Sequence, residues 1–167
     1  RGVIYSVNSW DNKFYNHTNE EAEDFKIEIS ESLENQKWKS FIKPKNEVLI
    51  GSCIFLKNWI IRSETSNALD RLFIRHISKE SEEELIISDE KVCVPNISLR
   101  QKDRDTDEVY IGYSSPKTPS RVYLYNLSKK TKKLVKEQII PSGHNPNDYV
   151  VERLSLIHIS EPTRHEC

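Results

Sequence analysis

The chain has 167 residues and a mass of 19.6 kDa, which is enough for one ordinary domain with a hydrophobic core. Its 25 basic and 26 acidic side chains nearly cancel, so the net charge gives no reason to expect a nucleic acid or an anionic membrane as a partner. The longest apolar stretch, residues 48–56, is about half of a membrane span and is interrupted by Gly51 and Ser52. We therefore expect a soluble protein.

The cysteines give no indication of a metal site or of a disulfide framework. Cys53, Cys93 and Cys167 are far apart, form no Cys-x-x-Cys pair and have no histidine at metal-ligand spacing. An odd number of cysteines without a signal peptide fits a reducing cytoplasm better than a disulfide-stapled secreted protein. We expect no cofactor. The chain also contains no methionine, so we expect it to be a piece of a longer protein.

Strand-like runs with two-residue alternation follow one another along most of the chain. The only helical signal is a short one at 145–151, where Asn145 can cap a turn that begins with Pro146. The sequence therefore predicts an all-β fold. In chain order, the predicted strands are 13–19, 24–30, 38–43, 48–56, 58–67, 70–78, 83–88, 92–99, 108–118, 120–128 and 132–140.

Three of these runs repeat one pattern. DFKIEIS, DRLFIRHIS and SRVYLYNLS end at Ser30, Ser78 and Ser128, which are 48 and 50 residues apart, and each lies between similar neighbouring runs. Four strands in about 50 residues is the size of a β-propeller blade. We therefore predict about three four-stranded blades of an incomplete propeller; the alternative is a meandering β-sandwich of unrelated strands.

Three blades are too few for a closed ring, because single-domain propellers have about four to eight. Open ends would leave about ten apolar side chains uncovered, or roughly 15–30 kcal/mol of lost burial. A typical domain is stable by only about 5–15 kcal/mol. The isolated chain is therefore predicted to be marginally stable or prone to aggregation.

The last part of the chain resembles a known family. Residues 110–153 are similar to the end of the propeller domain in the oligopeptidase B group of the prolyl oligopeptidase family of serine peptidases, and fainter similarity extends back to residue 3. The matching elements are Gly112-Tyr113-Ser114-Ser115, Thr118-Pro119-Ser120, Tyr123-x-Tyr125-x-Leu127, the run from Leu134 to Gln138, Asn145-Pro146-Asn147-Asp148-Tyr149 and Glu152-Arg153.

This resemblance implies that residues 1–153 are part of a seven-bladed propeller that leads into an α/β-hydrolase domain. The parent protein would carry a Ser-Asp-His triad in that domain and cleave short peptides after Lys or Arg. Its propeller would restrict access to the triad, so the expected partners are the hydrolase domain and short peptides. No catalytic residue can be assigned in this chain, since it contains no Gly-x-Ser-x-Gly nucleophile motif.

Two alternatives remain open at this point. One is a non-enzymatic propeller that serves as a protein-interaction scaffold, and the other is a complete small β-domain. A scaffold would continue with further blades, whereas a peptidase would continue with alternating strands and helices.

The C-terminal residues 154–167 depart from the family pattern. The string LSLIHISEPTR looks like the translation of a transposon adapter used in preparing sequencing libraries. We predict that this tail is not native, and His158, His165 and Cys167 are therefore left out of any site.

The remaining polar motifs have structural explanations. Ser114 and Ser115 could act as nucleophiles with His144 and Asp148, but they precede Pro116 at a strand end, which predicts a turn. The charged runs 20–24, 80–84 and 129–133 fall where the repeat places hairpin turns, and are predicted to be solvated turns. The tryptophans Trp10, Trp38 and Trp59 are predicted to pack within the blades.

Overall fold

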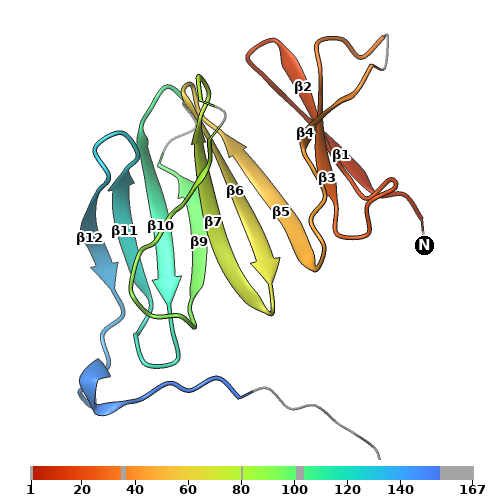
Figure 1. Cartoon of the computed structure of the whole chain (residues 1–167). Helices are drawn as coiled ribbons and strands as arrows, with labels where there is room; N and C mark the ends of the chain where they lie inside the picture. Colours follow the sequence, from red (N-terminus) through yellow and green to blue (C-terminus); the bar gives the residue numbers. More distant parts are fainter. Residues whose placement is uncertain (1, 35–36, 80, 101–103, 155–167) are drawn as a thin grey trace, which may run out of the picture.

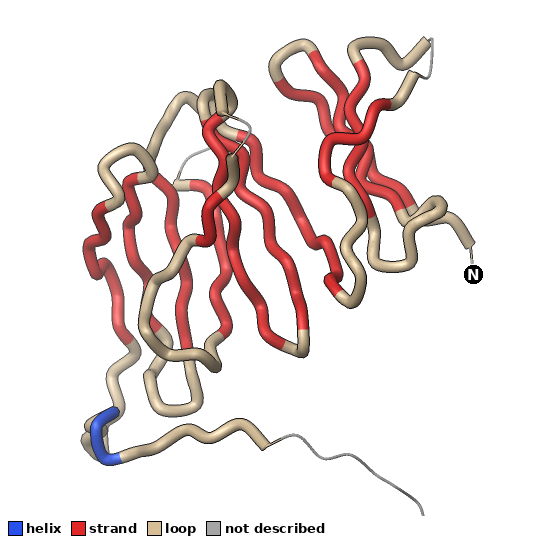
Figure 2. The backbone as a smooth tube through the Cα atoms, in the orientation of Figure 1, coloured by secondary structure: helices blue, strands red, loops and turns tan. Residues whose placement is uncertain are grey.

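The computed structural model describes residues 2–34, 37–79, 81–100 and 104–154 and consists of three four-stranded antiparallel sheets (Figures 1 and 2). Strands pair in chain order within each sheet, as in propeller blades. Blade 1 contains β1 (Tyr5–Trp10), β2 (Lys13–Thr18), β3 (Lys26–Ser30) and β4 (Lys39–Ile42). Blade 2 contains β5 (Val48–Phe55), β6 (Trp59–Ser66), β7 (Leu69–His76) and β8 (Glu83–Glu84). Blade 3 contains β9 (Val94–Leu99), β10 (Glu108–Ser114), β11 (Arg121–Asn126) and β12 (Thr131–Glu137).

The predicted all-β fold of about three blades is confirmed, with differences in detail. Strand β1 was not among the predicted runs, and β8 covers only two of the six residues predicted at 83–88. The helical signal at 145–151 is a 3-10 turn, Pro146–Asp148, in which the Asn145 side chain accepts a hydrogen bond from the Asn147 amide. The sheets stand side by side and do not close into a ring over the described residues.

Tight turns set the register of the hairpins. Asp11 and Asn12 join β1 to β2, and Asn67 and Ala68 join β6 to β7, with positive φ at all four residues. Two-residue turns of this kind match the twist of paired strands. In β5 the register shifts between Ile50 and Cys53, and a Cβ at Gly51 would lie 2.3 Å from the Ser63 hydroxyl, so only glycine fits beside β6.

Alternation along the strands places two separate clusters on the two faces of blade 2. On β6, Trp59 and Ile61 face blade 3, whereas Ile60 faces blade 1. We call these contacts the blade 2–3 junction and the blade 1–2 junction. The buried apolar residues of the blade 2–3 junction are Leu56, Trp59, Ile61, Leu72, Ile74, Leu85, Ile87, Val109, Ile111, Tyr113, Tyr125 and Leu127. Those of the blade 1–2 junction are Tyr15, Ile27, Ile42, Ile50, Phe55 and Ile60.

Both ends of the array expose apolar side chains. Tyr5 is 69% exposed on β1, and Val135 is 52% exposed on β12. Each of these strands is an edge strand of its sheet, so its free edge can pair with another chain. These surfaces are available for neighbouring blades.

The C-terminal segment, residues 138–154, turns back beneath the blades (Figure 1). It runs along the end that carries the β6–β7 and β10–β11 turns and the connections 43–47 and 85–93. We call this the segment end of the blades. The Arg153 guanidinium donates a hydrogen bond to the carbonyl oxygen of Asn67 in the β6–β7 turn.

Candidate functional site

The serines weighed as nucleophiles lie in a turn at the segment end. Ser114 is the last residue of β10. The Ser115 hydroxyl accepts hydrogen bonds from the amides of Lys117, at 3.3 Å, and Thr118, at 2.9 Å, and the Ser115 amide donates to the Thr118 carbonyl. This is the geometry of a serine that stabilises a turn, as the sequence predicted.

His144 and Asp148, the residues weighed as catalytic partners, hold the C-terminal segment in place. The His144 Nε2 atom is hydrogen-bonded to the Lys117 carbonyl oxygen at 2.7 Å, and the imidazole stacks on Tyr149 with ring centroids 5.0 Å apart. The Asp148 carboxylate accepts a hydrogen bond from the Asn145 side chain at 3.0 Å. The histidine therefore fastens the segment to the turn, and its ring nitrogen is engaged by a backbone carbonyl instead of a serine hydroxyl.

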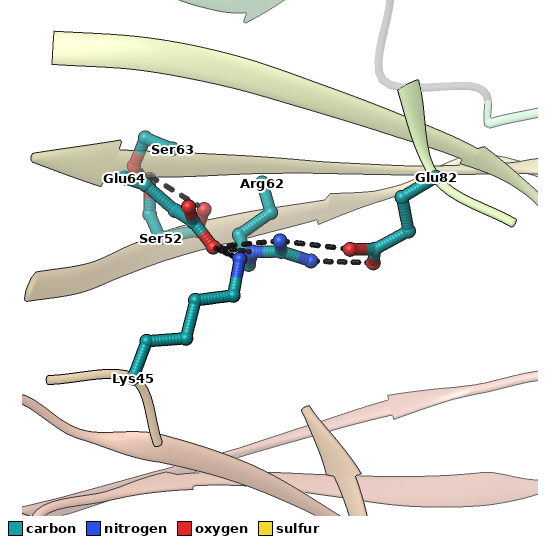
Figure 3. A network of polar contacts seen from close by, with 6 residues as sticks. All are labelled: Lys45, Ser52, Arg62, Ser63, Glu64 and Glu82. Carbon is teal, nitrogen blue, oxygen red and sulfur yellow. Dashed lines mark hydrogen bonds and ion pairs between the residues drawn. The ribbon is translucent and has the colours of Figure 1, made fainter. Parts of the chain in front are cut away.

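A network of charged side chains lies in the blade 1–2 junction and was not predicted (Figure 3). Arg62, on β6, has a side chain that is only 2% exposed. Its guanidinium donates to Glu64 Oε1 at 2.7 Å and to both carboxylate oxygens of Glu82, at 2.5 and 2.9 Å. Lys45, from the β4–β5 connection, reaches the same Glu64 oxygen at 2.7 Å. Arg62 thus joins the β7–β8 loop to strand β6 of the same blade. Lys45 joins the β4–β5 connection to that strand as well.

The surroundings of Arg62 keep it charged. Burial alone would lower the pKa of Arg62, but its hydrogen bonds to Glu82 and Glu64 and their negative charges outweigh burial and raise it. The guanidinium carbon also lies 5.3 Å from the centre of the Phe73 ring, and Lys45 Nζ lies 5.2 Å from it. Burial raises the pKa of the Cys53 thiol, on the neighbouring strand, to about 12. Cys53 is therefore a neutral thiol at physiological pH.

The network corrects the prediction that the acidic run 80–84 is a solvated turn. Glu83 and Glu84 form β8, and Glu82 pairs with the buried Arg62. The alternation of Arg62 and Glu64 on one strand puts opposite charges on the same face, and this signal could have indicated the pair. The lysine run fits its prediction at Lys129 and Lys130, which lie in the turn before β12.

Two of the three tryptophans pack between blades as predicted. Trp59 is buried in the blade 2–3 junction and donates its indole N–H to Asp107 at 2.9 Å. Trp10 stacks on Phe55 across the blade 1–2 junction, with ring centroids 5.8 Å apart. Trp38 is half-buried just before β4.

The charged network opens into a hollow of about 680 Å³ at the segment end. Lys45, Glu64, Arg71 and Arg153 line this hollow together with apolar residues of β5 and β7. Such a surface can bind a charged or polar partner. Among its lining residues, Ser66 has no histidine beside it, so the hollow contains no serine–histidine pair. We take the segment end, with this hollow and the C-terminal segment, as the candidate functional site.

The described part of the chain contains no group of three or more His, Cys, Asp or Glu residues that could hold a metal ion. It also contains no helix that is long and apolar enough to cross a membrane. The predicted tail, apart from Leu154, lies outside the described residues.

Comparisons with known proteins agree with this architecture. The family model of the prolyl oligopeptidase N-terminal β-propeller domain matches residues 1–138. A comparison with curated protein sequences gave no match.

Several solved structures have the same fold. Oligopeptidase B from Trypanosoma brucei, with covalently bound antipain and in a closed form, is 21% identical with a TM-score of 0.80, over 90% of this chain and 22% of that one. Oligopeptidase B from Leishmania major is 19% identical with a TM-score of 0.79, over 92% of this chain and 23% of that one. Prolyl oligopeptidase B from Galerina marginata is 14% identical with a TM-score of 0.72, over 87% of this chain and 21% of that one. The chain thus spans less than a quarter of the length of these structures.

Proposed function

Because this chain belongs to the prolyl oligopeptidase family, as part of the N-terminal β-propeller domain, we propose that it is the propeller part of a cytoplasmic serine peptidase. The parent protein hydrolyses short peptides after Lys or Arg. Its serine, histidine and aspartate lie in an α/β-hydrolase domain that follows the propeller, and acyl transfer to the serine is the chemical step.

The observation that carries this proposal is the path of the C-terminal segment. After β12 the chain returns beneath the blades and is fastened there at both ends, by His144 to the β10–β11 turn and by Arg153 to the β6–β7 turn. A domain that follows Arg153 is thereby delivered to the segment end. The charged hollow lined by Lys45 and Glu64 faces the same end and supplies polar contacts for it.

This chain's own contribution is to control access. The blades are packed against one another through buried apolar side chains, so a folded protein cannot pass between them. The described residues present no activated nucleophile, so the propeller part acts on peptides only by admitting or excluding them. Short peptides reach the triad either along the propeller axis or between the two domains.

The test is to sequence the codons that follow Arg153 in the source genome with a long read, and then to produce the full-length protein. We expect the frame to continue into an α/β-hydrolase domain with a Gly-x-Ser-x-Gly motif. The protein should cleave a short arginyl peptide and should react with a fluorophosphonate probe at the serine of that motif. A serine-to-alanine variant at the motif is the control and should lose both properties.

Size selectivity tests the gating role. The same cleavage sequence should be hydrolysed in a short peptide and spared when it is placed in an exposed loop of a folded protein. A frame that continues with further blades and no nucleophile motif would contradict the peptidase and favour the interaction scaffold.

A further inference from the structure

Glu90 ties two blades together at the segment end. It lies on the 85–93 connection between blades 2 and 3, and its Oε1 atom accepts a hydrogen bond of 2.6 Å from the Thr118 hydroxyl in the β10–β11 turn. Thr118 is only 3% exposed. The connection and the turn are therefore held together by one carboxylate.

The carboxylate of Glu90 is ionised but incompletely paired. Burial raises its pKa, but the nearby hydroxyl groups of Ser115, Thr118 and Tyr113 and the charge of Lys117 outweigh burial, so the pKa lies below its ordinary value. The Oε2 atom is shielded from solvent and has no hydrogen-bond partner of good geometry. Among the ion pairs of the described residues, none includes Glu90. A cation placed beside this shielded oxygen would add a close charge pair and would be stabilising.

A second shielded polar group lies beside it. Tyr113, on β10, is 3% exposed, and its hydroxyl also lacks a hydrogen-bond partner of good geometry. Burial and the neighbouring Glu90 charge raise the pKa of Tyr113 to about 12, so the hydroxyl keeps its proton. It offers an oxygen lone pair next to the carboxylate, and a charged N–H donor can use both oxygens.

Both residues line a cavity of about 500 Å³ between blade 2 and the 85–93 connection. Its walls combine apolar side chains, including Leu72, Ile87 and Cys93, with polar ones. The other charges on its walls are already matched or exposed: Arg71 pairs with Glu84 at 3.2 Å, and Asp70 accepts a hydrogen bond from Thr65 at 2.6 Å. Asp89 and Lys91, which also line the cavity, are exposed, so the shielded carboxylate of Glu90 beside the apolar side chains suits an alkyl chain that ends in a cation.

We propose that this cavity receives a lysine or arginine side chain from the domain that follows the propeller, with its charged head on Glu90 and Tyr113. This inference rests on the proposed function, because it requires that a folded domain follows Arg153. The site would fasten that domain to the connection between blades 2 and 3.

The path of the C-terminal segment supports this source. Residues 150–154 lie against Leu69 and Val92, and Leu69 lines the cavity as well. The segment thus runs directly past the cavity before the next domain begins.

The experiment uses the full-length protein and the variant Glu90→Gln, which keeps the shape of the side chain and removes its charge. Glu31→Gln, at an exposed acid of the β3–β4 loop, is the matched control. Hydrogen exchange of residues 85–93 and 150–154 should speed up about tenfold or more in Glu90→Gln and stay unchanged in the control, as expected for loss of a close charge pair. Tyr113→Phe should give a smaller increase in the same residues.

Replacing each Lys and Arg on the facing surface of the hydrolase domain by Ala should identify the partner. One such variant should reproduce the effect of Glu90→Gln, and combining the two should add nothing further. Unchanged exchange in Glu90→Gln, or full additivity with every partner variant, would overturn the proposal and leave a water-filled cavity.

Kinetics separate the alternatives. If Glu90→Gln changes only KM for peptides with an additional basic residue, the cation belongs to the substrate and the assignment to the next domain is wrong. The proposed function is judged independently, by whether the wild-type protein cleaves a short arginyl peptide. If the wild-type protein does not cleave that peptide but Glu90→Gln and one partner variant remain non-additive in hydrogen exchange, the proposed peptidase function is wrong and the proposed cation site is supported.

Discussion

The two junctions between the blades differ in the kinds of side chains that they bury. The blade 2–3 junction buries twelve apolar side chains, among them Trp59, Tyr113 and Tyr125. The blade 1–2 junction buries half as many apolar side chains. It contains aromatic contacts, such as that of Tyr15 with Phe55, whose ring centroids lie 4.5 Å apart, and the charged network around Arg62. The difference shows that one repeated blade pattern can be joined by two kinds of contact.

The two kinds of contact respond differently to separation. Opening the blade 2–3 junction exposes apolar surface, which water does not compensate. Opening the blade 1–2 junction also exposes Arg62, Glu64 and Glu82, which water can solvate and which carry a desolvation cost while buried. We therefore expect the blade 1–2 junction to separate more readily.

The largest effect is expected on removing Arg62. Arg62→Ala leaves Glu64 and Glu82 without their shared cation, and loss of one partner of a buried ion pair costs about 3–5 kcal/mol. The measurement is the free energy of unfolding in urea, followed by the fluorescence of Trp10. Arg71→Ala is the matched control, because its pair with Glu84 is 49% exposed on the arginine side and should contribute less than about 1 kcal/mol.

Alkylation of Cys53 provides a second measure of the same variant. With a pKa of about 12 in the folded protein and about 8.5 when exposed, the thiol should react on the order of 1,000-fold more slowly at pH 8 in the folded state. Arg62→Ala removes a charge that lowers this pKa, but by loosening the junction it should expose Cys53 more often and so accelerate the reaction, with Cys93 and Cys167 replaced by Ser. If Arg62→Ala is as stable as the wild type and labels no faster, the network does not stabilise the face of blade 2 that meets blade 1.

A somewhat smaller effect is expected in the blade 2–3 junction. Ile111 is fully buried and pairs with Ile97 and Tyr123 on the neighbouring strands, so Ile111→Ala should cost about 2–5 kcal/mol. Ile86→Ala, at a side chain that is 67% exposed, should change stability by less than about 0.5 kcal/mol.

Salt distinguishes the apolar contacts of the blade 2–3 junction from an exposed ion pair. Raising the ionic strength should leave the cost of Ile111→Ala unchanged and should reduce the cost of Arg71→Ala, whose pair with Glu84 is exposed. Unfolding of the Ile111 variant should be reported first by Trp59, which lies in the same junction. If the fluorescence of Trp10 reports the unfolding of the Ile111 variant before that of Trp59, the assignment of Ile111 to the blade 2–3 junction is wrong.

The sequence predicted the blades because their strands repeat at a nearly constant spacing and alternate cleanly. The pattern around Ser30, Ser78 and Ser128 placed the third strands of all three blades correctly. Strand β1 was missed because its alternation mixes polar residues with exposed apolar ones, as expected for an inner strand without a packed face. Strand β8 ends after Glu84 because Leu85 and Ile87 leave the sheet to enter the blade 2–3 junction.

The candidate site was harder to predict because its contacts join distant parts of the chain. The turn at Ser115 could be predicted from local residues, since its hydrogen bonds span at most three positions. The pairing of Arg62 with Glu82 and of Glu90 with Thr118 depends on how blades stack. Neither spacing nor composition carries that information.

The smallest effect is expected from Glu90, an ionised side chain that joins the connection between blades 2 and 3 to the β10–β11 turn. Its pKa is lower in the folded state than in the unfolded state, where it is about 4.3. Its contribution to stability is therefore complete above about pH 4.3 and is lost as the pH falls through the folded-state pKa. Glu90→Gln should consequently be less stable than the wild type at pH 7, and the two should converge as the pH approaches 3. The comparison requires unfolding free energies at both pH values, with Glu31→Gln as the control. Equal stability of Glu90→Gln and the wild type at pH 7 would show that this carboxylate does not bind blade 3 to the connection.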